Sequence, residues 1–271
     1  MKLALITSPL APLYSSPASS EVRIDEVLYG MIVEILDHND DNWCYINTPY
    51  NYKGYIEDKY LSIVDYELFA IENYNLLQVE SLFCDVLENP EIESKLLLTL
   101  PRGAYLYSAE QTCNKGMWTK VYLSPNTLGW VKSGHVKKEN KCNITEEKLR
   151  ENIVESALSY LGVQYRWGGK TPLGIDCSGL CSMAYMLNGI NIYRDAKLQS
   201  GFPIKPISKE ELKKADLIYY PGHIAMYLGD NKIIHATNSN GIVKINSINK
   251  NDQDYDNVHG SNIIAYGSYF D

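Results

Sequence analysis

Three residues in the C-terminal half of this 271-residue chain have the types and the order needed for nucleophilic catalysis. Cys177 follows a turn-rich loop and begins an apolar segment, Leu180 to Leu187, that predicts a helix ending at Gly189. A helix start has unpaired N–H groups and a partial positive charge, so we expect it to lower the pKa of Cys177 and favour the thiolate. His223 and His235 follow downstream as candidate bases.

The two histidines fall in a segment that predicts three short strands. The expected strands and the turns between them cover residues 217–220, 221–222, 223–228, 229–231 and 232–236. If the last two strands pair antiparallel, His223 and His235 become cross-strand neighbours. One imidazole could then act as general base for Cys177 while the other fixes its tautomer.

Each of these residues also has a simpler interpretation. A single cysteine is usually a small buried apolar residue, and a histidine on a strand is more often a hydrogen-bonded core or surface residue. The simpler interpretation weakens because the cysteine begins a helix, both histidines belong to one hairpin, and glycine-rich loops adjoin both elements. Cys181, one turn further along the same helix, is expected to be structural.

The elements that would position these residues belong to a domain that starts near residue 144. Thr145 is a candidate N-cap, with Glu146 and Glu147 in the first turn. Apolar residues recur at helical spacing from Ile153 onward until Gly162, which is a C-cap signal. The sequence therefore predicts one helix before the glycine-rich loop and a second helix after it.

The first 140 residues predict short strands separated by turns. They contain a weak repeat, because Gly30, Trp43 and Gly54 correspond to Gly103, Trp118 and Gly129 at offsets of 73 to 75 residues. Two similar small β-barrels are expected. The acidic segment between them, at 64–81, is expected to be a connector with some structure of its own.

Composition excludes several classes of function. The formal net charge of −8 and the absence of a basic run exclude a nucleic-acid partner. No apolar run approaches the roughly 20 residues that span a bilayer, so no membrane partner is expected. The apolar run at residues 3–6 is too short for a secretory leader, so we expect a cytoplasmic protein unless a leader was removed. Six cysteines without metal-ligand spacing predict no metal site.

Four motifs, YRWGG, DCSG, GHIAMYLG and IIHA, resemble in order and spacing the NlpC-type peptidases of the papain-like superfamily. The N-terminal repeat resembles the bacterial SH3-like domains of cell-wall enzymes. The resemblance implies an α+β fold, with a papain-like domain of a helix packed on an antiparallel sheet, preceded by two SH3-like β-barrels. The expected domains are a first SH3-like domain at 1–63, a connector at 64–80, a second SH3-like domain at 81–140 and the peptidase domain at 144–271.

The resemblance also implies roles for particular residues. Cys177 would be the nucleophile, His223 the base, His235 the orienting residue, and Tyr165 would help the Cys177 N–H hold the oxyanion. The residues expected at the substrate are Asp176, Ser178, Tyr52, Asp195 and Trp167, with Tyr50 and Tyr55 as alternatives to Tyr52. Asp176 could equally serve as the helix cap, and Arg194 could pair with an acidic neighbour or with a substrate carboxylate.

The RDA segment at 194–196 together with Gln199 makes the chain most similar to the γ-D-glutamyl-diamino acid endopeptidases of the dipeptidyl-peptidase VI type. That resemblance implies an enzyme that cleaves the bond between γ-D-Glu and a diamino acid in murein-derived peptides with a free N-terminal L-Ala. The chemistry needs only a thiolate and a base, so no metal or organic cofactor is expected, and we expect a monomer. Two alternatives stay open: an autolysin that acts on intact peptidoglycan, and a non-catalytic module that binds wall peptides.

Overall fold

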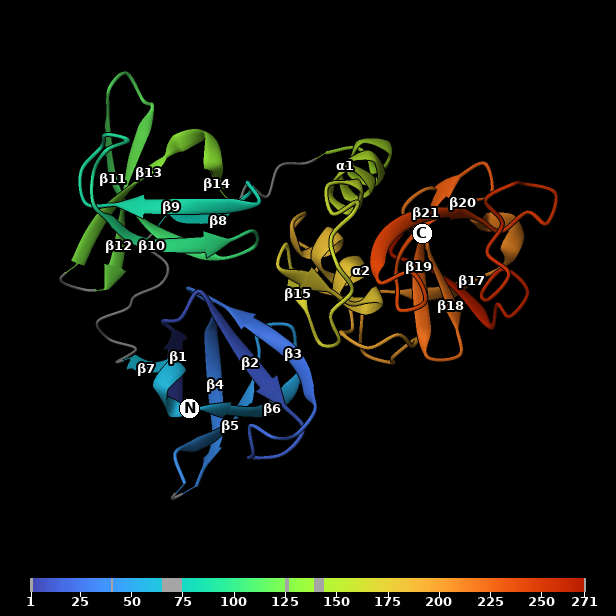
Figure 1. Ribbon diagram of the computed structural model, residues 1–271, viewed down its shortest axis with the longest axis horizontal. Helices are drawn as coiled ribbons and strands as arrows, with labels where there is room; N and C mark the ends of the chain where they lie inside the picture. Colours follow the sequence, from blue (N-terminus) through green and yellow to red (C-terminus); the bar gives the residue numbers. More distant parts are fainter. Residues whose placement is uncertain (1, 40, 65–74, 125–126, 139–143, 271) are drawn as a thin grey trace. The chain divides into compact units, whose positions relative to one another are not determined.

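The computed structural model describes residues 2–39, 41–64, 75–124, 127–138 and 144–270 (Figure 1). By internal contacts the chain divides into two compact units, residues 1–140 and 141–271. Most of the predicted connector, residues 65–74, lies outside the described residues, and so does the predicted boundary at 139–143.

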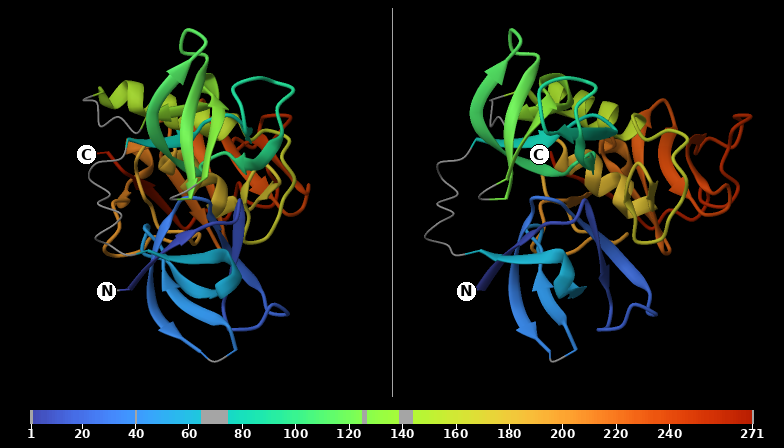
Figure 2. Two further views of the ribbon diagram at one scale, coloured as in Figure 1. Left: turned by 90° about the vertical axis from the view of Figure 1, so that its left-hand side faces the viewer. Right: turned by 60° about the vertical axis from the view of Figure 1, so that its left-hand side comes forward.

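The first unit begins with a seven-stranded antiparallel sheet that curls around a shared interior (Figures 1 and 2). Its strands are β1 (Lys2–Ile6), β2 (Leu10–Tyr14), β3 (Arg23–Leu28), β4 (Ile32–His38), β5 (Trp43–Asn47), β6 (Lys53–Glu57) and β7 (Leu61–Val64), with the 3₁₀ turn η1 (Asp58–Tyr60) before β7. The order across the sheet is β3-β2-β6-β5-β4-β1-β7. Alternate side chains, such as Leu13, Val33 and Ile56, are fully buried inside the curl, as the two-residue period of a strand requires.

The second sheet of this unit repeats the first. Its strands are β8 (Leu76–Val79), β9 (Phe83–Leu87), β10 (Leu96–Pro101), β11 (Tyr105–Cys113), β12 (Trp118–Ser124), β13 (Thr127–Lys132) and β14 (Val136–Lys138), with η3 (Ser133–His135) before β14. The order β10-β9-β13-β12-β11-β8-β14 is that of the first sheet with every number raised by seven. The repeat in the sequence therefore corresponds to a repeat of topology.

The two small β-barrels that the sequence predicts are not confirmed as closed barrels. Among the described residues, β3 and β7 are the two ends of the first order, and β10 and β14 are the two ends of the second. Each sheet is thus curled but open in its hydrogen bonding. The interior is closed by apolar side chains instead, among them Val79, Leu106 and Val121 of the second sheet.

Hydrogen bonds join the two sheets at the turn between β3 and β4. The Tyr105 N–H donates to the Tyr29 carbonyl at 2.8 Å, the Tyr107 hydroxyl donates to the Gly30 carbonyl at 3.2 Å, and the Tyr29 hydroxyl donates to the Leu123 carbonyl at 2.6 Å. Tyr29 and Tyr107 are buried, so these hydrogen bonds are protected from water.

Gly30 is required at this contact for two reasons. Its φ of +78° is in the left-handed region, and a Cβ there would lie 2.1 Å from the Tyr105 carbonyl oxygen. We expect Gly30→Ala to lower the free energy of unfolding by about 2 kcal/mol or more, measured by chemical denaturation. Gly116→Ala is the matched control, because Gly116 has a φ of +82° but nothing within 4 Å of its Cβ position. Equal losses in the two variants would show that the contact with Tyr105 contributes nothing.

The second unit contains the helices. Its elements are α1 (Glu146–Leu158), β15 (Lys170–Thr171), β16 (Gly174–Ile175), α2 (Cys177–Met186), β17 (Lys205–Ile207), η4 (Lys209–Glu211), β18 (Leu217–Tyr220), β19 (His223–Gly229), β20 (Lys232–Thr237), β21 (Ile242–Ser247) and β22 (Ala265–Ser268). Both predicted helices and the three predicted strands of the hairpin segment are confirmed. Thr145 caps α1 by accepting a hydrogen bond from the Lys148 N–H.

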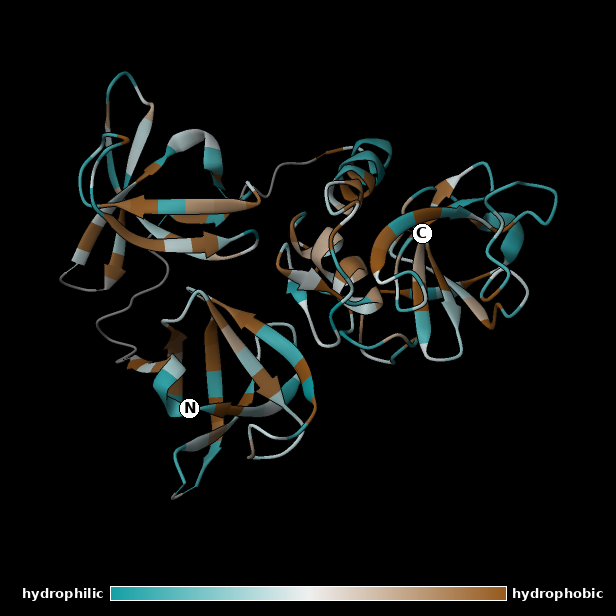
Figure 3. Ribbon diagram, viewed as in Figure 1, coloured by the Kyte–Doolittle hydropathy of each residue, from teal (hydrophilic) through white to brown (hydrophobic). Residues whose placement is uncertain are grey.

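A six-stranded antiparallel sheet of order β17-β22-β18-β19-β20-β21 forms the centre of this unit. Helix α2 packs on β19 and β20, and α1 packs on α2. The two helices differ in hydropathy, as Figure 3 shows: α1 is largely hydrophilic, whereas α2 is mostly neutral to apolar. All ten residues of α2 are buried, so the unit holds a helix in its interior. Among the described residues, no helix is both long and apolar enough to cross a membrane.

Candidate active site

Cys177 lies at the first turn of α2, with Asp176 as the N-cap residue. The Asp176 backbone is extended, and its Oδ1 accepts a hydrogen bond from the Gly179 N–H at 2.6 Å. The glycine-rich loop before the helix packs closely on this turn, because a Cβ at Gly179 would lie 2.2 Å from the Gly169 carbonyl oxygen. The loop and the cap together enclose Cys177, which is a buried residue at 6% exposure.

The helix start acts on the pKa of Cys177 in the expected direction, through the backbone N–H of Ser178, but burial outweighs it and the net shift is upward. Burial, with a smaller contribution from the Asp176 carboxylate, raises the pKa of the Cys177 thiol to about 11. Hydrogen bonds from the backbone N–H groups of Ile224 and Ser178 act in the opposite direction but do not reverse the shift. The hydrogen bond from the Ile224 N–H also places the sulfur at the start of β19, because His223, the first residue of this strand, directly precedes Ile224.

The raised pKa predicts how Cys177 reacts with an alkylating reagent. Below a pKa of about 11 the thiolate fraction rises tenfold per pH unit, so we expect the rate of iodoacetamide labelling to rise at that rate from about pH 7 to about pH 10. Mass spectrometry of the peptide that contains Cys177 separates this rate from those of the other cysteines. A rate independent of pH across neutrality would instead indicate a preformed thiolate–imidazolium pair.

His223 and His235 contact each other, but not as directly opposed residues. The register pairs Met226 with Ile234 and contains a bulge beyond Tyr227, so the two histidines are diagonal to each other across β19 and β20. Their rings nevertheless approach, with His223 Nε2 2.9 Å from His235 Nδ1. The two imidazoles therefore share a hydrogen bond, as the sequence led us to expect.

Asn246 on β21, which the sequence did not single out, sets the direction of this bond. Its Nδ2 donates to the Asp254 carbonyl at 2.9 Å, so its Oδ1 is the atom that faces His235 Nε2 at 3.1 Å. His235 Nε2 must then carry a proton, His235 Nδ1 must accept, and His223 Nε2 must donate. We call His223, His235 and Asn246 the histidine relay. It leaves His223 Nδ1 with a free lone pair, the form that a general base needs.

Removal of the Asn246 amide tests the histidine relay. We expect Asn246→Ala to lower kcat by roughly 10- to 100-fold, because His235 can then adopt the tautomer that no longer accepts from His223. Peptide hydrolysis under saturating substrate measures it. Asn188→Ala is the control, because it removes an amide that bonds to Ser156 and Ala184, outside the histidine relay. Equal kcat values for the two variants would contradict the tautomer argument.

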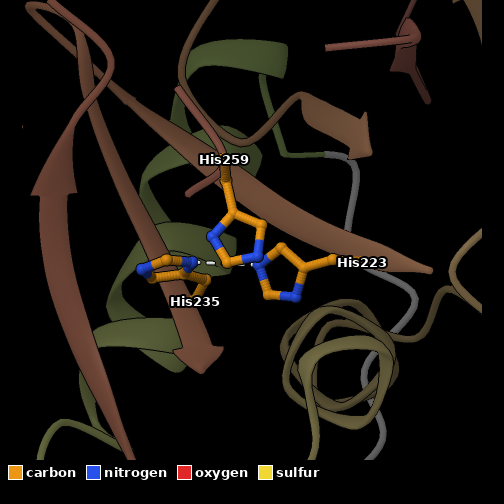
Figure 4. A group of neighbouring side chains, drawn as sticks. All are labelled: His223, His235 and His259. Atoms are coloured by element: carbon orange, nitrogen blue, oxygen red, sulfur yellow. Dashed lines mark hydrogen bonds between the residues drawn. The ribbon is translucent and has the colours of Figure 1, made fainter. Parts of the chain in front are cut away.

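A third histidine, His259, lies over His223 and was also not singled out by the sequence (Figure 4). The rings of His259 and His223 are stacked at 4.1 Å between centroids. His259 Nδ1 lies 2.8 Å from Asp256 Oδ2, and the same carboxylate oxygen lies 3.6 Å from His235 Nε2. Burial lowers the pKa of His223 to about 3, with smaller contributions from His259 and His235, so His223 is neutral near pH 7.

The Asp176 carboxylate already has a cation partner within the chain. Arg194 donates from Nη1 to Oδ1 and from Nη2 to Oδ2, each at 3.0 Å, and both side chains are less than a tenth exposed. Asp176 also accepts from the N–H groups of Gly168 and Gly179 and from the Ser178 hydroxyl. The sequence left two partners open for Arg194, an acidic neighbour and a substrate carboxylate. In the structure Arg194 pairs with an acidic neighbour, Asp176.

The other predicted residues occupy different positions. Burial raises the pKa of Tyr165 to about 12, and the next contribution comes from Cys177, which places the phenol near the sulfur. Trp167 is 61% exposed in the loop before α2, and Asp195 accepts a hydrogen bond from the Tyr193 hydroxyl. Tyr52 belongs to the first unit, where its N–H donates to Thr48 Oγ1.

The two alternatives to Tyr52 are engaged within the first unit. The Tyr50 hydroxyl donates to the buried Asp25 carboxylate at 2.5 Å, and Tyr55 packs on Tyr45.

A cysteine at a helix start beside a hydrogen-bonded pair of histidines, on a helix-and-antiparallel-sheet unit, defines a hydrolase of the cysteine peptidase class. Comparison with known proteins identifies the family. The NlpC/P60 family model matches residues 162–259, and the bacterial SH3 domain model matches residues 10–62. Dipeptidyl-peptidase 6 of Lysinibacillus sphaericus is 39% identical over 273 residues, which cover 98% of this chain and 99% of that protein. The chain belongs to the NlpC/P60 family.

Two further relatives bear on the fold and the chemistry. The crystal structure of an NlpC/P60 family protein from Bacillus cereus matches with a TM-score of 0.81 at 21% identity, covering 98% of this chain and 99% of that one, and so supports the fold alone. A gamma-D-glutamyl-L-lysine dipeptidyl-peptidase from the same species is 29% identical over 138 residues, which are 48% of this chain and 41% of that protein.

Proposed function

We propose that this protein hydrolyses the bond between γ-D-Glu and a diamino acid in murein-derived peptides that carry a free N-terminal L-Ala. The main support is full-length similarity to dipeptidyl-peptidase 6, combined with a histidine relay that leaves one lone pair on His223. We place this activity in the cytoplasm, in the reuse of wall peptides. In the first unit, the matched strand order supports a second SH3-like domain after the first.

The proposed reaction has two steps. His223 Nδ1 takes the Cys177 proton as the sulfur attacks the γ-carbonyl carbon, and the Cys177 N–H and the Tyr165 hydroxyl hold the oxyanion. The protonated His223 then gives the proton to the departing amine, which leaves a thioester on Cys177. Water, deprotonated by His223, releases the L-Ala–D-Glu dipeptide and restores the thiol.

Recognition of the free amine is proposed for Asp176 and Ser178, with Trp167, Asp195 and Tyr52 as further substrate contacts. The ion pair with Arg194 constrains this proposal, because Asp176 already accepts five hydrogen bonds. Ser178 Oγ lies 2.7 Å from Arg194 Nη1 and 3.2 Å from Asp176 Oδ1, so the hydroxyl can turn toward a substrate ammonium while the ion pair stays closed.

Ser178→Ala should therefore raise KM for the free peptide and leave turnover of an N-acetylated peptide unchanged.

One experiment tests the proposed function against both alternatives. The protein is incubated with the L-Ala-γ-D-Glu-diamino acid peptide, with its N-acetylated form and with purified sacculi, and products are separated by chromatography. We expect cleavage of the free peptide and at least about 100-fold slower cleavage of the other two. Comparable rates on sacculi would establish an autolysin. A wild-type protein that behaves like Cys177→Ala on all three substrates would establish a binding module.

A further inference from the structure

The three imidazoles of His223, His235 and His259 lie close enough together to be candidate ligands of a single metal ion. One ring nitrogen from each lies within 4.8 Å of those of the other two. Figure 4 shows a nitrogen of His259 beside the point where the dashed line joins His223 and His235. Because His259 Nδ1 faces Asp256, the nitrogen at this point is Nε2. The three candidate ligand atoms are therefore His223 Nε2, His235 Nδ1 and His259 Nε2.

The outward-facing nitrogens of two of these rings are already held in the way that metal sites require. A histidine that binds a metal usually donates its second N–H to a carboxylate or a carbonyl oxygen, which fixes the ring and its tautomer. His259 Nδ1 faces the Asp256 carboxylate at 2.8 Å, and His235 Nε2 faces the Asn246 amide oxygen at 3.1 Å. Asp256 is fixed in turn by the backbone N–H groups of Val258 and His259.

The ligand type and the spacing select the metal. Neutral imidazoles suit Zn²⁺ and neighbouring transition metals, whereas Mg²⁺ and Ca²⁺ require oxygen ligands. Two nitrogens at about 2.0–2.1 Å from a tetrahedral Zn²⁺ are separated by roughly 3.4 Å. The 2.9 Å contact between His223 and His235 has to open by about half an ångström, and the His259 ring has to turn out of its stacked position on His223, because each imidazole binds a metal in its own ring plane. Three protein ligands leave a fourth position for water.

We propose that His223, His235 and His259 form a Zn²⁺ site that switches off the peptidase reversibly. The inactivation follows from proton positions and rests on the proposed function. Zn²⁺ takes the lone pairs of His223 Nε2 and His235 Nδ1, so the proton that His223 Nε2 donated moves to His223 Nδ1. His223 then has no lone pair for the Cys177 proton, although the metal does not touch the sulfur.

Metal binding is measured apart from activity, by calorimetry with Zn²⁺ and by the absorption spectrum with Co²⁺. We expect one Co²⁺ bound through nitrogen and oxygen, without the sulfur-to-metal charge-transfer band of a thiolate ligand. Cys177→Ala should bind with unchanged affinity. His259→Ala should bind at least about 100-fold more weakly, and Asp256→Asn about 10- to 100-fold more weakly. His259→Gln, which can still donate to Asp256, repeats the test if His259→Ala fails to fold.

The chain offers a matched control. In the first unit, His38, Cys44 and Asp58 also place ligand atoms within 4.8 Å of one another, and His38 is exposed. His38→Ala should leave the thiolate-free Co²⁺ spectrum intact. The proposal is overturned if His38→Ala removes binding while His259→Ala keeps it, or if Cys177→Ala abolishes it.

Inhibition of peptide hydrolysis by Zn²⁺ is measured as the fraction of each variant's own metal-free rate. The Zn²⁺ concentration that gives half inhibition should be at least about tenfold higher for His259→Ala than for the unchanged protein. Binding that persists in a protein without hydrolysis would contradict the proposed function but not the metal site.

Discussion

Replacement of Cys177 by Ala is expected to reduce hydrolysis of the L-Ala-γ-D-Glu-diamino acid peptide by at least about 10⁵-fold, because no other group can form the thioester. The expected loss is this large because residues of a catalytic set act as a unit, and the histidine relay has no function without the sulfur. Initial rates at high enzyme concentration measure it.

Cys181 provides the control for this prediction. It lies one turn further along α2, is fully buried, and its burial holds its pKa well above the ordinary value. Cys181→Ala removes the same atom from the same helix, and we expect it to keep activity within severalfold. If the two variants lose activity equally, the loss reflects damage to α2 and not the chemistry of Cys177.

Loss of the Arg194 guanidinium should have the largest effect on stability. Arg194→Leu leaves the Asp176 carboxylate buried without its cation, so we expect the free energy of unfolding to fall by about 3–5 kcal/mol. Urea denaturation followed by circular dichroism measures the loss. A double variant, Asp176→Asn with Arg194→Met, should recover part of it, because neither side chain is then a buried unpaired charge.

An exposed ion pair gives the comparison for Arg194. Lys148 and Glu151 are 3.2 Å apart on α1, and both side chains are more than half exposed. Lys148→Leu should change stability by less than about 1 kcal/mol, since water replaces the lost partner. An effect of Arg194→Leu in that same small range would show that the buried pair is as dispensable as the exposed one.

Local patterns predicted much of the second unit. The turn-rich loop before Cys177, the apolar run after it and the glycine at 189 predicted α2. The turn residues Gly222 and Gly229 have positive φ angles, which explains why the hairpin strands could be located from sequence. The topological repeat of the first unit was visible in its Gly and Trp spacing, but the hydrogen bonding at the ends of each sheet was not.

The sequence by itself predicted Cys177 as the nucleophile and the hairpin that holds its base, because a helix start and a turn are local features that nearby residues dictate. Only the tertiary structure decided what surrounds them. Asn246, Asp256 and His259 reach the hairpin from a strand and a turn further along the chain. Burial by α2 and the sheet then raised the pKa of Cys177, where the helix start alone would have lowered it. The sum of desolvation and nearby charge sets a pKa, and both depend on segments that are distant in sequence.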